Sequence, residues 1–113
     1  MSMDEDMADT LSFLKETGFD FVEMPVGGTD NRPADLLKWQ QLGQQAANLG
    51  LGVQTCSMLP SQLNLISSDE TVRQAGIDYL KHLVDCSAAA GSAILMGPLY
   101  AGFKTFTGKP ATP

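Results

Sequence analysis

The feature that most constrains this chain is a cycle of helix, glycine, short strand and polar loop, which recurs roughly every 35 residues. The first cycle predicts a helix over 7–17, where apolar residues recur at spacings of three and four. The helix ends at Gly18, at the position where a left-handed cap residue is common. Aromatic and branched residues over 19–24 then predict a strand, and the composition of 27–31 predicts a loop.

The second and third cycles repeat this order. The second predicts a helix within 33–50 and a strand over 52–56, and the third predicts a helix followed by a strand over 93–96. Ser67 and Glu70 have capping-box spacing at the start of the third helix. Helices between successive strands form right-handed crossovers, which give a parallel sheet. The nearly continuous apolar strands fit a sheet of this kind.

Ligands of parallel α/β sheets bind at the carboxyl ends of the strands, which here are 23–28, 56–60 and 97–103. Glu23 ends an apolar strand, and the pattern leaves two roles open: an anchor for a substrate hydroxyl, or a structural carboxylate bound by backbone N–H groups. Cys56 has no histidine near it in sequence, so we expect a small residue lining a pocket rather than a nucleophile.

The histidine and the large aromatic residues of the helices are assigned to structure. His82 is the only histidine, and one histidine cannot build a metal site. Since it lies beside Lys81 and Asp85, we expect it on a solvated helix face. Trp39 and Tyr79 are expected in the core.

Charge and composition exclude several classes of partner. A net charge of -6 argues against nucleic acid, which requires clustered basic residues. The sequence contains neither a membrane-length apolar run nor a basic amphipathic helix. The acidic N-terminus has the wrong charge for a signal peptide, and two cysteines form no disulfide framework. We therefore expect a cytoplasmic protein with reduced thiols.

Three strands are too few for a closed barrel, which needs eight strands and roughly 250 residues. Three parallel strands also leave two open sheet edges, which favour association. We expect one domain over 1–113, with helix–strand units at 7–26, 33–57 and 67–97 and an irregular tail over 98–113. The chain is then either a portion of a larger barrel or a unit whose edges are covered by another copy.

Three segments resemble one family. Gly18-Phe19-Asp20-Phe21-Val22-Glu23 is similar to the second strand of sugar phosphate isomerases and epimerases with the xylose-isomerase-like barrel, which include the D-tagatose 3-epimerase group. Residues 67–80 resemble that group's third helix, and 91–100 resemble the following strand and its loop. The similarity spans about 7–107. It implies an α/β fold, a partial (β/α)8 TIM barrel containing the second, third and fourth strands.

The resemblance implies a sugar or sugar phosphate as substrate and a divalent metal, Mn²⁺ or Mg²⁺, in the complete enzyme. In the family, the metal ligands and both catalytic glutamates come from later strands, which would follow residue 113, so none is expected in this chain. Cys56 matches a cysteine that borders the sugar pocket, and Phe103 lies near an aromatic position that walls it. Glu23 matches a strand-end acid that is not a metal ligand. These three residues are the predicted substrate-binding residues.

The leading hypothesis is the N-terminal part of a metal-dependent sugar (phosphate) isomerase or epimerase, inactive alone. The alternative is a self-standing, non-catalytic domain that forms homo-oligomers through its open sheet edges. A third hypothesis is an enzyme completed by a partner chain that carries the remaining strands.

Overall fold

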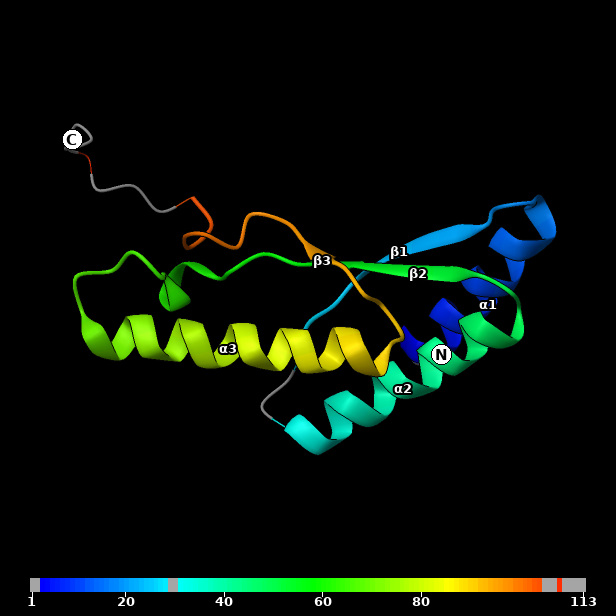
Figure 1. Ribbon diagram of the computed structural model, residues 1–113, viewed down its shortest axis with the longest axis horizontal. Helices are drawn as coiled ribbons and strands as arrows, with labels where there is room; N and C mark the ends of the chain where they lie inside the picture. Colours follow the sequence, from blue (N-terminus) through cyan, green and yellow to red (C-terminus); the bar gives the residue numbers. More distant parts are fainter. Residues whose placement is uncertain (1–2, 29–30, 105–107, 109–113) are drawn as a thin grey trace.

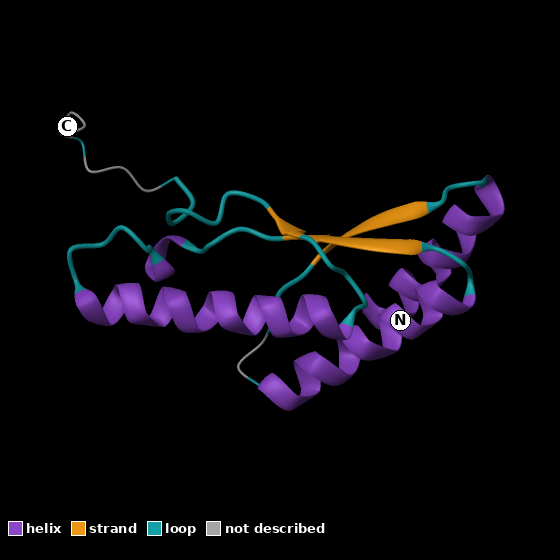
Figure 2. Cartoon of the chain, viewed as in Figure 1, coloured by secondary structure: helices purple, strands orange, loops and turns teal. Residues whose placement is uncertain are grey.

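The computed structural model describes residues 3–28, 31–104 and 108, and it alternates helices with strands as the sequence predicts (Figures 1 and 2). Among these residues the elements, in chain order, are α1 (Met3–Thr17), β1 (Phe21–Pro25), α2 (Arg32–Asn48), β2 (Gly52–Cys56), the short 3₁₀ helix η1 (Ser61–Leu63), α3 (Glu70–Ala89) and β3 (Leu95–Met96). None of the described helices is long and apolar enough to cross a membrane.

The strands form one parallel sheet in the order β1-β2-β3, which confirms the predicted topology. Phe21 lies opposite Gly52 at the start of the ladder, and Pro25 lies opposite Cys56 at its end. Cys56 in turn lies opposite Met96. The carboxyl ends of all three strands therefore line up at one edge of the sheet.

The two faces of the sheet have different surroundings, because side chains alternate along each strand. On one face, Met24, Val26 and Thr55 are buried against the helices, which lie on that side of the sheet in Figure 1. The opposite face, here called the open face, retains large solvent exposure: 64% for Phe21 and 37% for Met96. The residues of the open face are Phe21, Glu23, Pro25, Gly52, Gln54, Cys56 and Met96.

The core lies between the helices and the buried face of the sheet. Its buried apolar residues come from the three α-helices, from β1 and from the residues next to these elements: Leu11, Met24, Val26, Trp39, Leu42, Ala46, Leu51, Leu83, Cys86 and Ala90. Burial of each large side chain contributes about 1.5–3 kcal/mol. Trp39 is in this core, and Tyr79 packs against it half-buried, as predicted.

Glycines end the helices as predicted, with φ of 104° at Gly18, 74° at Gly50 and 81° at Gly91. The predicted capping box of α3 is wrong. Asp69 is the N-cap, because its carboxylate accepts a hydrogen bond from the Thr71 N–H at 2.9 Å. The Ser67 hydroxyl instead accepts from the Asp69 N–H at 3.1 Å, and Ser67 lies two residues before the N-cap.

The third strand is shorter than the predicted 93–96. The Ser92 hydroxyl accepts from the N–H of Ile94 and donates to its carbonyl, so the backbone turns there and the strand begins at Leu95. Of the predicted tail, residues 105–107 and 109–113 lie outside the described residues. The described part of the tail is joined to the loop after β2 by a parallel bridge between Leu59 and Gly102.

Candidate functional site

The candidate site lies at the carboxyl ends of the strands, where backbone hydrogen bonds extend the sheet beyond the named strands. The Val26 N–H donates to the Cys56 carbonyl at 2.8 Å, and the Ser57 N–H donates to the Met96 carbonyl at 3.0 Å. The first residues of the loops after β1 and β2 are thereby held rigidly. Side chains on the last residues of these strands have fixed positions relative to one another.

Glu23 and Cys56 are brought together on the open face. Glu23 is exposed and Cys56 is half-buried, and the Glu23 carboxylate acts on the Cys56 thiol from the neighbouring strand. Burial raises the pKa of Cys56, and the Glu23 carboxylate raises this pKa further. The thiol is therefore protonated at neutral pH, which suits a polar wall residue better than a nucleophile.

Phe103, the third predicted residue, lies on the loop after β3. Its ring is 47% exposed, and the Lys104 ammonium nitrogen lies 5.4 Å from the ring centroid. The Phe103 N–H donates to the Leu59 carbonyl at 2.8 Å, which ties this loop to the loop after β2. The structure thus joins Glu23 and Cys56 directly and places Phe103 on an adjacent loop.

Gly97, directly after β3, allows the loops after β2 and β3 to approach closely. It has a φ of 135°, and a β-carbon at this position would overlap the Ser57 carbonyl oxygen. Only glycine fits both the conformation and the space. This close approach fixes the edge of the site between β2 and β3.

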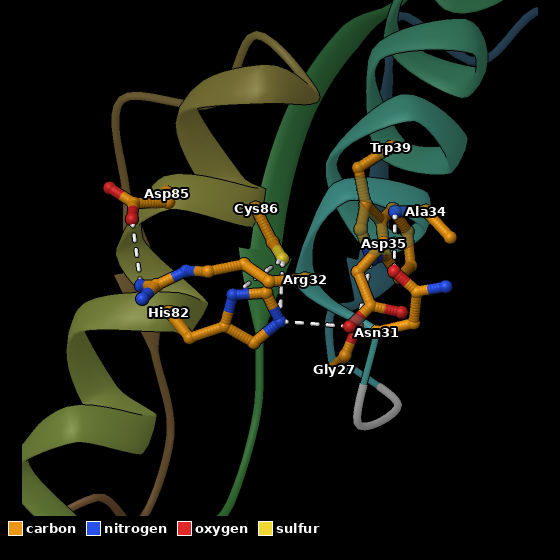
Figure 3. Close-up of polar contacts among 9 residues, drawn as sticks. All are labelled: Gly27, Asn31, Arg32, Ala34, Asp35, Trp39, His82, Asp85 and Cys86. Atoms are coloured by element: carbon orange, nitrogen blue, oxygen red, sulfur yellow. Dashed lines mark hydrogen bonds and ion pairs between the residues drawn. The ribbon is translucent and has the colours of Figure 1, made fainter.

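The prediction that His82 lies on a solvated helix face is wrong. His82 is 8% exposed, and its Nε2 atom lies 3.0 Å from Oδ2 of the buried Asp35 (Figure 3). The neighbours used for the prediction, Lys81 and Asp85, are exposed, and Asp85 forms an ion pair with Arg32 at 3.0 Å. His82 instead lies on the face of α3 that packs against α2.

A helical pattern in the sequence could have located this buried pair. Tyr79, His82 and Cys86 are spaced by three and four residues, so they share one face of α3. Tyr79 was assigned to the core from the sequence, and the same face therefore predicts burial of His82. A buried histidine needs a polar partner, and Asp35 in the first turn of α2 supplies it.

The described residues do not fit the divalent metal that the family resemblance implies. Among them, no group of three or more His, Cys, Asp or Glu side chains could hold a metal ion. The nearest arrangement is the Asp35–His82 pair with Cys86, whose Sγ lies 3.7 Å from Nε2 of His82. Burial raises the pKa of Cys86 to about 11, with the charge of Asp35 adding to the effect. A protonated thiol is a poor metal ligand.

Comparison with known proteins identifies the fold. A family model described as the xylose isomerase-like TIM barrel matches residues 11–112. The chain belongs to this family. Its helices and parallel strands are therefore part of a TIM barrel. The helices of such barrels form the outer ring. The open face of this sheet, which lies opposite the helices, therefore corresponds to the inner face of the barrel.

Relatives within the family include sugar epimerases. L-ribulose-5-phosphate 3-epimerase UlaE from Salmonella heidelberg (strain SL476) is 33% identical over an alignment of 90 positions, and the match covers 75% of this chain and 32% of that protein. A solved L-ribulose 3-epimerase matches with a TM-score of 0.79 and 25% identity, over 98% of this chain and 36% of that one.

A third match extends the fold comparison. The D-psicose 3-epimerase of Clostridium cellulolyticum H10, solved with D-tagatose, has a TM-score of 0.72 and 19% identity, over 95% of this chain and 36% of that one. This likeness concerns the fold. The chain spans about a third of the length of the relatives that it matches.

Proposed function

We propose that this chain forms part of the substrate wall of a metal-dependent sugar or sugar phosphate isomerase or epimerase. The observation that carries the proposal is the placement of Glu23 and Cys56 together on the open face, at the carboxyl ends of β1 and β2, where Glu23 raises the pKa of Cys56. This is the position where ligands bind in barrels of this kind. The relatives with 25% or more identity are sugar 3-epimerases, which supports the substrate class.

The three wall residues have different roles in this proposal. The Glu23 carboxylate accepts a hydrogen bond from a sugar hydroxyl, while Cys56 supplies a small, neutral surface beside it. Phe103 offers an exposed aromatic ring for the C–H face of the sugar. Such a set orients a polyol by a few polar contacts on an otherwise apolar wall.

We also propose that the chain does not catalyse the reaction by itself. The described residues supply no metal cluster, so the divalent metal and the catalytic carboxylates belong to the remaining strands of the barrel. Both thiols, Cys56 and Cys86, are free, which agrees with a reducing cytoplasm as the proposed location. Titration of the purified chain with Mn²⁺ should show no tight stoichiometric binding, and such binding would contradict this division of roles.

A grafted enzyme tests the wall directly. Residues 11–104 of this chain replace the matching third of the Salmonella L-ribulose-5-phosphate 3-epimerase, and epimerase activity is measured. The graft should be active, and Glu23→Gln should lower its kcat/KM by about tenfold, the size expected for a hydrogen bond to a charged group. Glu16→Gln, the same change at an exposed residue near the end of α1, is the matched control and should leave kcat/KM unchanged.

The result can also refute the proposal. If the graft is active and Glu23→Gln and Cys56→Ala both retain full kcat/KM, these residues do not touch the sugar. A graft that folds, with native-like circular dichroism, but lacks activity contradicts the assignment to sugar epimerases.

The second candidate function is a non-catalytic unit that self-associates. The observation that favours it is exposed apolar surface: Phe21 and Met96 on the open face, and a groove of about 310 Å³ between α1 and the outer edge of β1. Analytical sedimentation at micromolar concentrations distinguishes the two candidate functions. A dimer or larger assembly supports self-association, whereas a stable monomer contradicts it.

A further inference from the structure

Asp35 and His82 form a polar pair buried between two helices. Asp35 belongs to the first turn of α2 and His82 to the middle of α3, and their side chains are only 5% and 11% exposed. Nε2 of His82 lies 3.0 Å from Oδ2 of Asp35, and the Cys86 sulfur lies within 4 Å of both ring nitrogens, 3.7 Å from Nε2 and 3.9 Å from Nδ1 (Figure 3). The proposed sugar chemistry does not use this pair. Burying two polar groups costs free energy unless they are paired with each other, as these two are.

The loop after β1 packs directly on this pair. A β-carbon at Gly28 would overlap the His82 Nε2 atom and would lie 2.7 Å from Oδ2 of Asp35. The backbone of Gly28 therefore rests against both polar groups, with no room for a methyl group. Gly28 does not have a positive φ, so its backbone conformation does not require glycine. Glycine is required here because a side chain would overlap His82 and Asp35.

Two aromatic side chains hold the same segment from either helix. The indole N–H of Trp39, one turn after Asp35 in α2, donates to the Gly27 carbonyl at 2.8 Å. The hydroxyl oxygen of Tyr79, one turn before His82 in α3, lies against the same segment, 3.8 Å from the position that a β-carbon on Gly27 would take. The Gly27 carbonyl is thus bonded to a side chain of α2, and the Tyr79 side chain of α3 packs against the same segment.

We infer that Asp35 and His82, with Trp39 and Tyr79, form a clamp that positions the Gly27–Gly28 segment at the carboxyl end of β1. The clamp residues are positioning residues. They fix the start of the loop that follows Glu23 by only four residues, and so set the edge of the substrate wall. The part of this inference that concerns the sugar rests on the proposed function, whereas the clamp itself does not.

The single tryptophan provides the readout. In a ¹⁵N-labelled sample the chain has one indole N–H resonance, and its rate of exchange with solvent reports the bond between Trp39 and Gly27. His82→Leu removes the bond between His82 and Asp35 and should accelerate this exchange by at least about tenfold. His82→Gln retains a side-chain N–H that can reach Asp35, so it should restore most of the protection.

Ser87→Ala is the matched control. It also removes a buried hydrogen bond from α3, the one between Ser87 and Thr55, but it lies away from the loop. Indole exchange in this variant should stay within about twofold of the unchanged chain. Equal acceleration in Ser87→Ala and His82→Leu, or no acceleration in His82→Leu, would overturn the inference.

Gly28→Ala tests the clamp from the loop side and keeps all four clamp residues. The added methyl group should displace the loop and accelerate indole exchange by about tenfold as well. If His82→Leu fails to fold, Gly28→Ala and His82→Gln decide the question, and a folded Gly28→Ala chain with unchanged indole exchange overturns the inference.

The role of the clamp in sugar binding is tested separately in the grafted epimerase. His82→Leu should raise KM by about fivefold, with a smaller change in kcat, and His82→Gln should reverse the rise. A graft without activity would contradict the proposed function and leave the exchange result standing. An active graft with an unchanged KM in His82→Leu would contradict the link between clamp and wall.

Discussion

Glu23 and Cys56 meet diagonally across the sheet, since Glu23 lies opposite Gln54 and Cys56 lies opposite Pro25. Glu23 raises the pKa of Cys56 although the two residues are two positions apart in the register. The carboxylate and thiol therefore form one polar patch beside the loops of the candidate site. This arrangement gives Cys56 a titration behaviour that depends on a residue in another strand.

The first prediction concerns the reactivity of Cys56. Because burial and Glu23 raise its pKa, little thiolate is present at mildly alkaline pH, and alkylation by iodoacetamide should be slow. Glu23→Gln removes the part of the rise due to Glu23, so the pKa should fall. The alkylation rate at a fixed pH should then increase by about two- to fivefold, and the rate–pH profile should move to lower pH.

The control for this measurement is Glu16→Gln, which should leave the profile in place. Cys86 does not interfere, because it is buried and its pKa is raised to about 11. A profile that moves to higher pH in Glu23→Gln would show that Glu23 does not raise the pKa of Cys56.

The second prediction concerns the core. Leu83 is fully buried in α3, while its neighbour Val84 is 55% exposed on the same helix. Leu83→Ala should lower the free energy of unfolding by about 2–5 kcal/mol, and Val84→Ala should change it by less than about 0.5 kcal/mol. Urea denaturation of both variants measures the difference. Equal effects would be incompatible with the packing of α3 described above.

The third prediction concerns the hydroxyl network beneath β2. Thr55 is fully buried, and its hydroxyl lies 2.8 Å from both the Ser87 hydroxyl and the Ile94 carbonyl. Thr55→Val keeps the shape but removes these bonds, so the free energy of unfolding should fall by about 1–3 kcal/mol. Thr55→Ser keeps the hydroxyl and should retain most of the hydrogen-bond contribution. If the serine and valine variants are equally destabilised, the network does not contribute.

The fourth prediction compares two glycines with positive φ. An alanine at Gly91 has no heavy atom within 4 Å of its added methyl, so only backbone strain of about 1–2 kcal/mol is expected. Gly97→Ala brings similar strain and also forces the loop after β2 away from β3. Thermal or urea unfolding should therefore show a larger loss for Gly97→Ala. A larger loss for Gly91→Ala would contradict the close approach of Gly97 to Ser57.

Patterns that depend on neighbours in sequence predicted most of the fold. The helices, their terminal glycines at Gly18, Gly50 and Gly91, and the parallel sheet all follow from periodicity and from the alternation of elements. Strand and cap boundaries were less accurate at Ser67 and Ser92. At both positions a hydroxyl forms a local turn that competes with the regular element.

Contacts between distant segments were harder to foresee. His82 was misassigned because its charged neighbours in sequence lie on the exposed side of α3, while its partner Asp35 is 47 residues away. The sequence predicts that Glu23 and Cys56 both lie at strand ends, but their proximity depends on the register between β1 and β2, which the sequence pattern does not fix. Their role as substrate-binding residues, with Phe103, stays a prediction.

The most direct test of the account is the alkylation rate of Cys56 in the grafted epimerase, followed by mass spectrometry of the peptide that contains it, with and without L-ribulose 5-phosphate. If the open face is the inner face of a sugar-binding barrel, Cys56 should react more slowly in the graft than in the isolated chain. Saturating sugar should slow the reaction further, by at least about fivefold. Equal rates in the graft and the isolated chain, unaffected by sugar, would contradict the claim that this sheet face walls the substrate pocket.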